Sequence, residues 1–142
     1  MRELAQERLV IAVRAAASIE GMLERTIRYT RDRKVFGQAI FEFQNARFKL
    51  AHARAKAEMV RTYVDHCIAR HLRRELSPVD AAMAKLNATE LQNQLLDEFL
   101  QLHGGYGYMS EYMVGTAWVD ARVMRIYGGT DEIMKEIIAR TL

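Results

Sequence analysis

Hydrophobic residues recur at intervals of three and four positions along most of this chain, which is the period of an amphipathic helix. The first such stretch runs from about Arg2 to Arg31, and the second from about Glu42 to Arg74. The first stretch carries two neighbouring apolar stripes, formed by Leu9, Val13, Ala16, Leu23 and Ile27 and by Ala12, Ala15, Ile19 and Met22. Two stripes make a wide apolar face, so we expect this helix to face the core of a bundle.

The segment Ser77-Pro78-Val79-Asp80 has the features of a helix start. Serine suits the N-cap, proline the first helical position and an acid the third. We expect the third helix to run from there to about His103, where three glycines follow within four positions. A shorter helical segment is expected from Glu111 to about Arg122, and a last helix from Asp131 onward.

These elements predict an all-α fold. Residues strongly disposed to form helices are abundant, Pro78 is the only proline, and no segment shows the alternation typical of a strand. Long helices joined by short connections favour an antiparallel up-and-down four-helix bundle, here with an additional short C-terminal helix. The length of 142 residues indicates one domain, which we assign to 1–142.

Charge and hydropathy exclude several classes of function. The formal net charge is +3, and the basic residues are spread along helical faces, so nucleic acid is not an expected partner. No apolar run approaches the roughly 20 residues that span a bilayer, and the N-terminus is too polar for a signal peptide. We therefore expect a protein of the cytoplasm in a bacterium, or of the mitochondrial matrix in a eukaryote.

We expect no metal centre. Cys67 is the only cysteine, so a thiolate cluster is excluded. No glutamate has a histidine three residues further on, as di-iron bundles require. The four histidines show no spacing of four, and we interpret them as core or surface residues.

Three glycine-containing motifs could hold an anionic ligand. The first, Tyr29 to Ile40, gathers cations and an aromatic residue at a helix end, where an arginine could grip a phosphate with two parallel hydrogen bonds. The second, Gln101 to Tyr108, interleaves three glycines with two tyrosines. The third, Ile126 to Arg140, leads a Gly-Gly pair into a threonine N-cap, whose amides could receive a phosphate or thioester oxygen. Taken singly, each motif also fits ordinary helix capping.

Taken together, the motifs resemble those of the acyl-CoA dehydrogenases. Arg-x-x-Phe-Gly followed by Gln, then Gln-x-x-Gly-Gly-x-Gly-Tyr, then Ile-Tyr-x-Gly-Thr, occur in the order and at the spacing of that family's C-terminal helical domain. The resemblance covers nearly the whole chain and is especially marked to the long-chain type. Members are flavoproteins that desaturate acyl-CoA thioesters between the α and β carbons. They also have an N-terminal helical domain and a middle β-domain, so we expect this chain to be an excised or truncated domain that is inactive alone.

The resemblance implies positions for FAD and for the substrate. The residues that would contact the FAD of a neighbouring subunit are Arg33 and Phe36 from the first motif, Gln44 four residues after it, and Gln101, Gly104 and Gly105 from the second motif. The residues that would meet FAD at the start of the last helix are Thr130 and Glu132. The residues that would contact the acyl-CoA substrate are Arg8, Gly128 and Gly129.

The resemblance also implies a catalytic base. Many members carry it as a glutamate directly after the tyrosine of the last motif, but Gly128 occupies that position here. Long-chain and isovaleryl members place it instead on the first bundle helix, in a Glu-Arg-Leu segment. This chain has Glu7-Arg8-Leu9 there, so Glu7 is the candidate base. A desolvated carboxylate suits the removal of a weakly acidic α-proton.

Partners follow from the same resemblance. Family members form dimers of dimers through this domain, so we expect a homodimer or homotetramer. They pass electrons to an electron-transfer flavoprotein, which makes that protein an expected partner. Two alternatives stay open from the residues alone: a non-catalytic helical oligomerisation or adaptor module, and a flavin oxidase or monooxygenase of the same superfamily.

Overall fold

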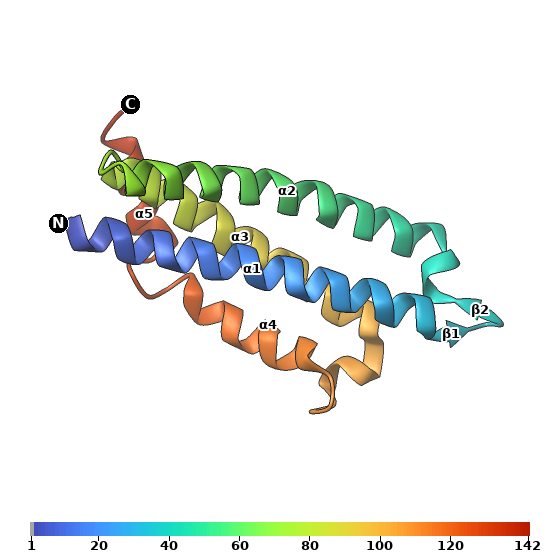
Figure 1. Ribbon diagram of the computed structural model, residues 1–142. Coiled ribbons are helices and arrows are strands. Elements are labelled where there is room, and N and C mark those ends of the chain that lie inside the picture. The colour runs from blue at the N-terminus through green and yellow to red at the C-terminus, as the bar shows by residue number, and fades with distance from the viewer. Residues whose placement is uncertain (1) are drawn as a thin grey trace.

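The computed structural model describes residues 2–142 as a bundle of long helices (Figure 1). Its main helices are α1 (Arg2–Asp32), α2 (Gln44–Leu72), α3 (Pro78–His103) and α4 (Met113–Met124), and α5 (Asp131–Ala139) follows as a short fifth. Two 3-10 turns, Ile40–Glu42 and Gly104–Tyr108, join longer elements. The prediction of an all-α, up-and-down bundle with a short last helix is confirmed. The second and fourth helices each begin two residues later than their sequence patterns indicate.

The core forms where the apolar face of α1 meets α2 and α3. One cluster joins Ile19 and Leu23 of α1 to Leu50 of α2 and Phe99 of α3. A second cluster, toward the N-terminus of α1, joins that helix to Val64 of α2 and to small residues of α3. The burial of both predicted stripes of α1 explains why this helix stays continuous over 31 residues.

Local capping sets where α3 and α5 begin. The Ser77 hydroxyl accepts a hydrogen bond from the Asp80 amide at 3.0 Å, and the Asp80 carboxylate accepts one from the Ser77 amide at 3.2 Å. This is a complete capping box, with Pro78 in the first turn. At α5, the Thr130 hydroxyl accepts from the Ile133 amide at 3.4 Å. The start signals predicted at both positions are therefore present.

A small β-hairpin between α1 and α2 was not predicted. Strands β1 (Lys34–Val35) and β2 (Gln38–Ala39) pair antiparallel around the two-residue loop Phe36-Gly37. Both loop residues have positive φ, 52° and 84°, as a type I′ turn requires. Strands of two residues are too short to show alternation, so the sequence carried only the glycine as a signal.

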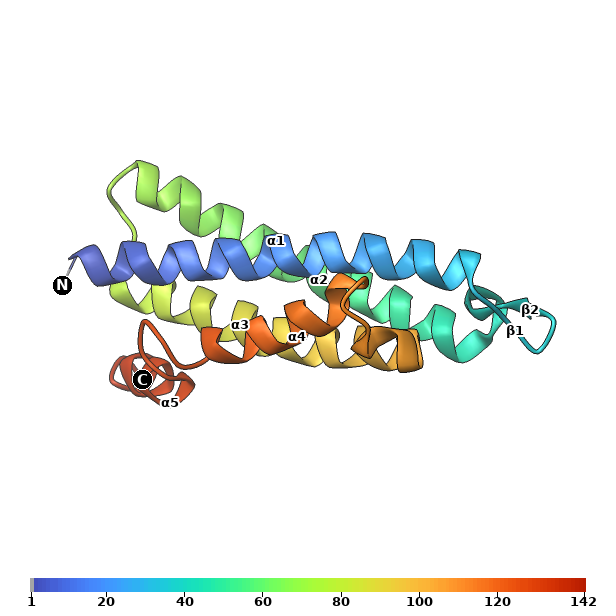
Figure 2. The ribbon, with the colours of Figure 1, turned by 90° about the horizontal axis from the view of Figure 1, so that it is seen from below.

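The antiparallel course of the helices gives the bundle two distinct ends (Figures 1 and 2). The hairpin end holds β1, β2 and the Gly104–Tyr108 turn that follows α3. The turn end holds the N-terminus of α1, the start of α3, the α4–α5 connection and α5, which packs through Met134 on Ala82 and Leu86 of α3. Among residues 2–142, no helix is both long and apolar enough to cross a lipid bilayer.

Candidate functional sites at the two ends of the bundle

At the turn end, the Gly128-Gly129 pair needs glycine for its backbone. The two residues have φ values of 68° and 103°, which side chains disfavour. A Cβ on Gly128 would lie 2.5 Å from Ile11 Cδ1, and one on Gly129 would lie 2.7 Å from Met134 Cε. The turn therefore lies against α1 on one side and α5 on the other.

Two cations from different helices hold the carbonyl groups of this turn. Arg8 Nε, on α1, donates a hydrogen bond to the Gly128 carbonyl oxygen at 3.1 Å. Lys85 Nζ, on α3, donates to the Gly129 carbonyl oxygen at 2.8 Å. The Lys85 side chain is 0% exposed. Burial lowers the pKa of this lysine, and the nearby Asp131 carboxylate opposes that change.

Asp131 supplies a counter-charge to Lys85 and also pairs with Arg125. Its carboxylate is almost fully buried, accepts a hydrogen bond from Arg125 Nε at 2.5 Å, and lies 3.6 Å from Lys85 Nζ. The Arg125 guanidinium also lies 3.6 Å from the Glu90 carboxylate, and both side chains are partly exposed. The charged cluster therefore extends to the surface. Lys85, Arg125 and Asp131 were not predicted as site residues. A lysine within the alanine-rich buried face of α3 was the one available signal for Lys85.

Glu7 lies on the surface of α1, the helix that contacts this turn. It directly precedes Arg8, which bonds to Gly128, and stands four residues before Ile11, which lies against Gly128. Glu7 is exposed to solvent. The helix that carries the candidate base is thus the one that contacts the Gly-Gly turn, through Arg8 and Ile11.

Thr130 and Glu132 lie at the start of α5. Thr130 caps this helix, as described above, and the Glu132 side chain is exposed. A hydrogen bond from its own backbone amide, helped by one from the Thr130 hydroxyl, lowers the pKa of Glu132. The Glu132 carboxylate therefore interacts with some of the backbone N–H groups by which a helix N-terminus attracts anions.

At the hairpin end, several predicted FAD-contacting residues line one open pocket of about 360 Å³. They are Arg33, Gln101, Gly104 and Gly105. The Arg33 guanidinium lies over the Tyr106 ring, 4.8 Å from its centroid, which favours a cation–π contact. Phe36 and Gln44 are not in the lining. Phe36 is at the hairpin tip, 97% exposed, and Gln44 is exposed at the first position of α2.

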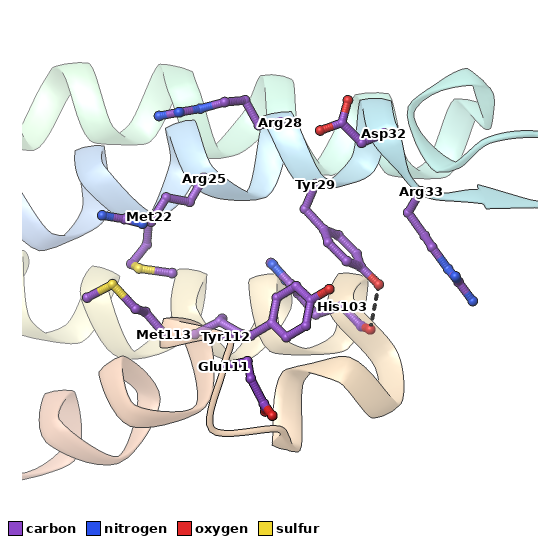
Figure 3. Close-up of a pocket in the computed structure, with 11 residues that line it drawn as sticks. Met22, Arg25, Arg28, Tyr29, Asp32, Arg33, His103, Glu111, Tyr112 and Met113 are labelled. Atoms are coloured by element: carbon purple, nitrogen blue, oxygen red, sulfur yellow. Dashed lines mark hydrogen bonds between the residues drawn. The ribbon is translucent and has the colours of Figure 1, made fainter.

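A second pocket, of about 470 Å³, opens next to the first (Figure 3). Tyr29 and His103 stack between the two, with ring centroids 4.1 Å apart, and the Tyr29 hydroxyl donates to the His103 carbonyl oxygen at 3.1 Å. The ring of His103 is fixed further because its Nδ1 lies 2.8 Å from the Phe99 carbonyl oxygen, to which it donates. Burial lowers the pKa of this histidine. The sequence analysis did not assign these aromatic residues to a site.

The two ends are far apart within one chain. Glu7 and Arg33 are separated by 26 residues of almost continuous helix, or about 40 Å at 1.5 Å per residue. The turn-end residues and the hairpin-end residues therefore do not form a single site within this chain. Within residues 2–142, no three His, Cys, Asp or Glu side chains gather as a metal ion would require.

Comparison with known proteins gives the relationship directly. The family described as "Acyl-CoA dehydrogenase, C-terminal domain" matches residues 1–142. The mitochondrial long-chain specific acyl-CoA dehydrogenase of Rattus norvegicus is 48% identical over the whole chain. Subunit CarC of the caffeyl-CoA reductase-Etf complex of Acetobacterium woodii is 33% identical over the whole chain.

A solved structure shows the same fold. The acyl-CoA dehydrogenase of Geobacillus kaustophilus superposes with a TM-score of 0.97, at 41% identity, over 99% of this chain and 37% of its own. The chain spans 33% of the rat protein and 38% of CarC, so it corresponds to about a third of these relatives. The family match, the identities and the superposition agree with the three sequence motifs. The chain belongs to the acyl-CoA dehydrogenase C-terminal domain family.

Proposed function

We propose that this chain is the C-terminal domain of an FAD-dependent acyl-CoA dehydrogenase, and that it supplies the catalytic base and part of the FAD site. In this proposal it works with an N-terminal helical domain and a middle β-domain. The observation that carries it is the contact between α1 and the Gly-Gly turn. Arg8, which directly follows Glu7 on α1, bonds to Gly128, the position where other family members carry their glutamate.

Residues at both ends have side chains and backbone groups that could bind FAD. A guanidinium, an amide side chain and exposed glycine backbone surround the hairpin-end pocket, a donor set that fits a diphosphate. A Cβ added at Gly104 or Gly105 would meet nothing within 4 Å, so this backbone leaves room for a bulky ligand. FAD, when bound, supplies the hydride acceptor of the reaction. We assign Arg33, Phe36, Gln44, Gln101, Gly104 and Gly105 to one FAD, and Thr130 and Glu132 to another.

The role of Glu7 is to remove the α-proton of the thioester. A carboxylate becomes a better base when water is excluded, and Glu7 is exposed in this chain alone. We therefore expect substrate and the middle domain to cover it. In this proposal Arg8, Gly128 and Gly129 contact the substrate near its reacting carbons. Amides of the turn would stabilise the thioester oxygen, which gains negative charge as the α-proton leaves.

The distance between the two ends supports an oligomer. Since about 40 Å separates Glu7 from Arg33, the hairpin of one copy would reach the FAD whose other contacts come from the turn end of a second copy. We propose a homodimer or a homotetramer on this basis. Because the Etf complex subunit CarC is a relative, we propose an electron-transfer flavoprotein as the electron acceptor. Since the relatives include a mitochondrial enzyme, the matrix or a bacterial cytoplasm is the proposed location.

Exchange of Glu7 for glutamine in the protein with all three domains tests this function. Glutamine keeps the shape of the side chain and cannot accept the proton. We expect Glu7→Gln to retain FAD and bind acyl-CoA, while flavin reduction in a single-turnover experiment slows by about 10²–10⁴-fold. Glu3→Gln, an exposed glutamate one turn earlier on α1, is the matched control.

Each other outcome of this experiment excludes part of the proposal. Flavin reduction at the unchanged rate would show that Glu7 is not the base. Absence of flavin from the unmodified protein would favour a non-catalytic oligomerisation or adaptor module. Direct reoxidation of the reduced flavin by oxygen during turnover would favour an oxidase or monooxygenase.

A further inference from the structure

Lys85 is a buried cation that nothing in the proposed reaction yet uses. It lies on α3, amid buried residues of that helix such as Ala81, Ala84 and Ala88. Placing an ammonium group in such surroundings is unfavourable unless specific partners compensate for the loss of water. Its partners are the Gly129 carbonyl oxygen at 2.8 Å and the Asp131 carboxylate at 3.6 Å. Both partners belong to the segment that joins α4 to α5.

The bond to Gly129 fixes the direction of the next amide. In a planar trans peptide, the carbonyl oxygen and the N–H group point to opposite sides. When Lys85 holds the Gly129 oxygen, the Thr130 N–H therefore points away from α3. Arg8 does the same for the preceding peptide, because it holds the Gly128 oxygen and so turns the Gly129 N–H away from itself.

These two amides are free to receive a ligand. Among the hydrogen bonds that the structure gives for residues 2–142, none is donated by the amides of Gly129 or Thr130. Two adjacent glycines with positive φ have little intrinsic preference for one conformation. The orientation of the amides therefore depends on the side chains that donate hydrogen bonds to the two carbonyl oxygens, Arg8 and Lys85.

We propose that Lys85 is a positioning residue that locks the Gly129–Thr130 peptide and so fixes the direction in which the Thr130 amide donates to an acceptor oxygen of the bound ligand. This inference rests on the proposed function for its catalytic consequence. The lock itself depends only on the contacts of this chain. Asp131 opposes the lowering of the Lys85 pKa by burial, because it is the carboxylate that approaches the ammonium group.

Lys85→Met and Lys85→Gln test the lock in the 142-residue chain. Both side chains are one atom shorter than lysine, so the 2.8 Å contact to Gly129 would lengthen by about 1.5 Å and be lost. Glutamine still gives the buried Asp131 carboxylate a polar neighbour. If the methionine variant does not fold, the glutamine variant can therefore be measured in its place. The control is Thr89→Val, which removes a buried hydroxyl one turn further along α3 without touching the turn.

Backbone ¹⁵N relaxation is the first measurement. We expect the order parameters of Gly129 and Thr130 to fall from about 0.85 to below about 0.6 in both Lys85 variants, while the helices stay rigid. Thr89→Val should leave these two residues unchanged. A turn as rigid as in the unmodified chain would overturn the proposal. So would a general loss of order in both variants, because Lys85 would then serve the fold alone.

The second measurement uses the protein with all three domains. At saturating acyl-CoA, Lys85→Met should slow flavin reduction by about 10²-fold, as a misplaced donor does, whereas Thr89→Val should not. Flavin reduction at the normal rate by a variant whose turn is mobile would overturn the positioning role and leave the proposed function intact. If the unmodified protein reduces no flavin, the proposed function fails, and the relaxation data still decide whether Lys85 locks the turn.

Discussion

The turn end and the hairpin end differ in how their backbone is supported. At the turn end, two buried cations hold consecutive carbonyl groups, and the buried Asp131 carboxylate lies beside one of them, Lys85. At the hairpin end, Arg33 and Gln101 are exposed around an open pocket, and Phe36 extends into solvent from a positive-φ position. The turn end is therefore preformed within the chain, whereas we propose that the hairpin end becomes a complete site only when another surface covers it.

Loss of Arg33 should have the largest effect on ligand binding and little effect on folding. Hydrogen bonds to charged groups contribute about 1.5–3 kcal/mol, so Arg33→Ala should weaken FAD binding by roughly 10–100-fold in the three-domain protein. The free energy of unfolding of the 142-residue chain should change by less than about 0.5 kcal/mol. Arg14→Ala, at an exposed arginine within α1, is the control. Unchanged flavin affinity would remove Arg33 from the FAD site.

Glycine substitutions should separate the two ends by stability. Gly129→Ala forces a side chain into φ 103° and against Met134, so we expect the free energy of unfolding to fall by about 1–3 kcal/mol. Gly105→Ala at the hairpin end meets open space and should change it by less than about 0.5 kcal/mol. Chemical denaturation of both variants measures the difference. Equal losses would show that the turn end is not the more constrained of the two.

Lowering the pH should reduce the stability of the folded chain, because His103 at the hairpin end is buried in its neutral form. Burial lowers the pKa of this histidine below its ordinary value of about 6.5, so the unfolded chain binds its proton more readily than the folded chain. Stability should therefore decline as pH falls below about 6.5, by at most about 1.4 kcal/mol per pH unit for this group. His103→Gln should remove that component in denaturation experiments, and exposed His52→Gln should keep it. An identical pH dependence in both variants would exclude His103 as the cause.

Relief of strain at Phe36 should give the smallest effect, and one of opposite sign. Asparagine tolerates positive φ, and Asn-Gly is a preferred type I′ pair. Phe36→Asn should therefore raise the free energy of unfolding by about 0.5–1 kcal/mol while it weakens FAD binding or self-association. Thermal unfolding and sedimentation equilibrium measure the two sides. A gain in stability with full binding and association would show that Phe36 has no role in contacts outside the chain.

The sequence predicted the fold well because the fold depends on local periodicity. The stripes of α1, the capping box at Ser77 and the N-cap at Thr130 are short-range patterns, and all three occur as expected. The motif residues followed from a family resemblance. Lys85 did not, since its role depends on contacts with residues more than 40 positions away, and no local pattern records them.

The hairpin between α1 and α2 is a local element that the sequence pattern did not predict. Two-residue strands are too short for periodicity, and the positive φ of Phe36 follows from loop closure between α1 and α2. Residue type alone did not indicate the exposure of Phe36, because aromatic residues are usually counted toward the core, and only the family resemblance placed it in a contact outside the chain. Tyr29 and His103 were likewise not assigned to a site, since their stacking joins residues of two different helices.

The bond between Arg8 and Gly128 connects residues 120 positions apart, so it can form only after almost the whole chain has been arranged. Loop-closure entropy makes such a contact a late step in folding. Until α5 docks, Lys85 lacks both of its partners from the last segment, which makes a state with only α5 detached unfavourable. Amide hydrogens of α5 should consequently exchange at rates close to those of the core, although a nine-residue terminal helix ordinarily frays. The end of the chain is thereby included in the cooperative folding unit of the bundle.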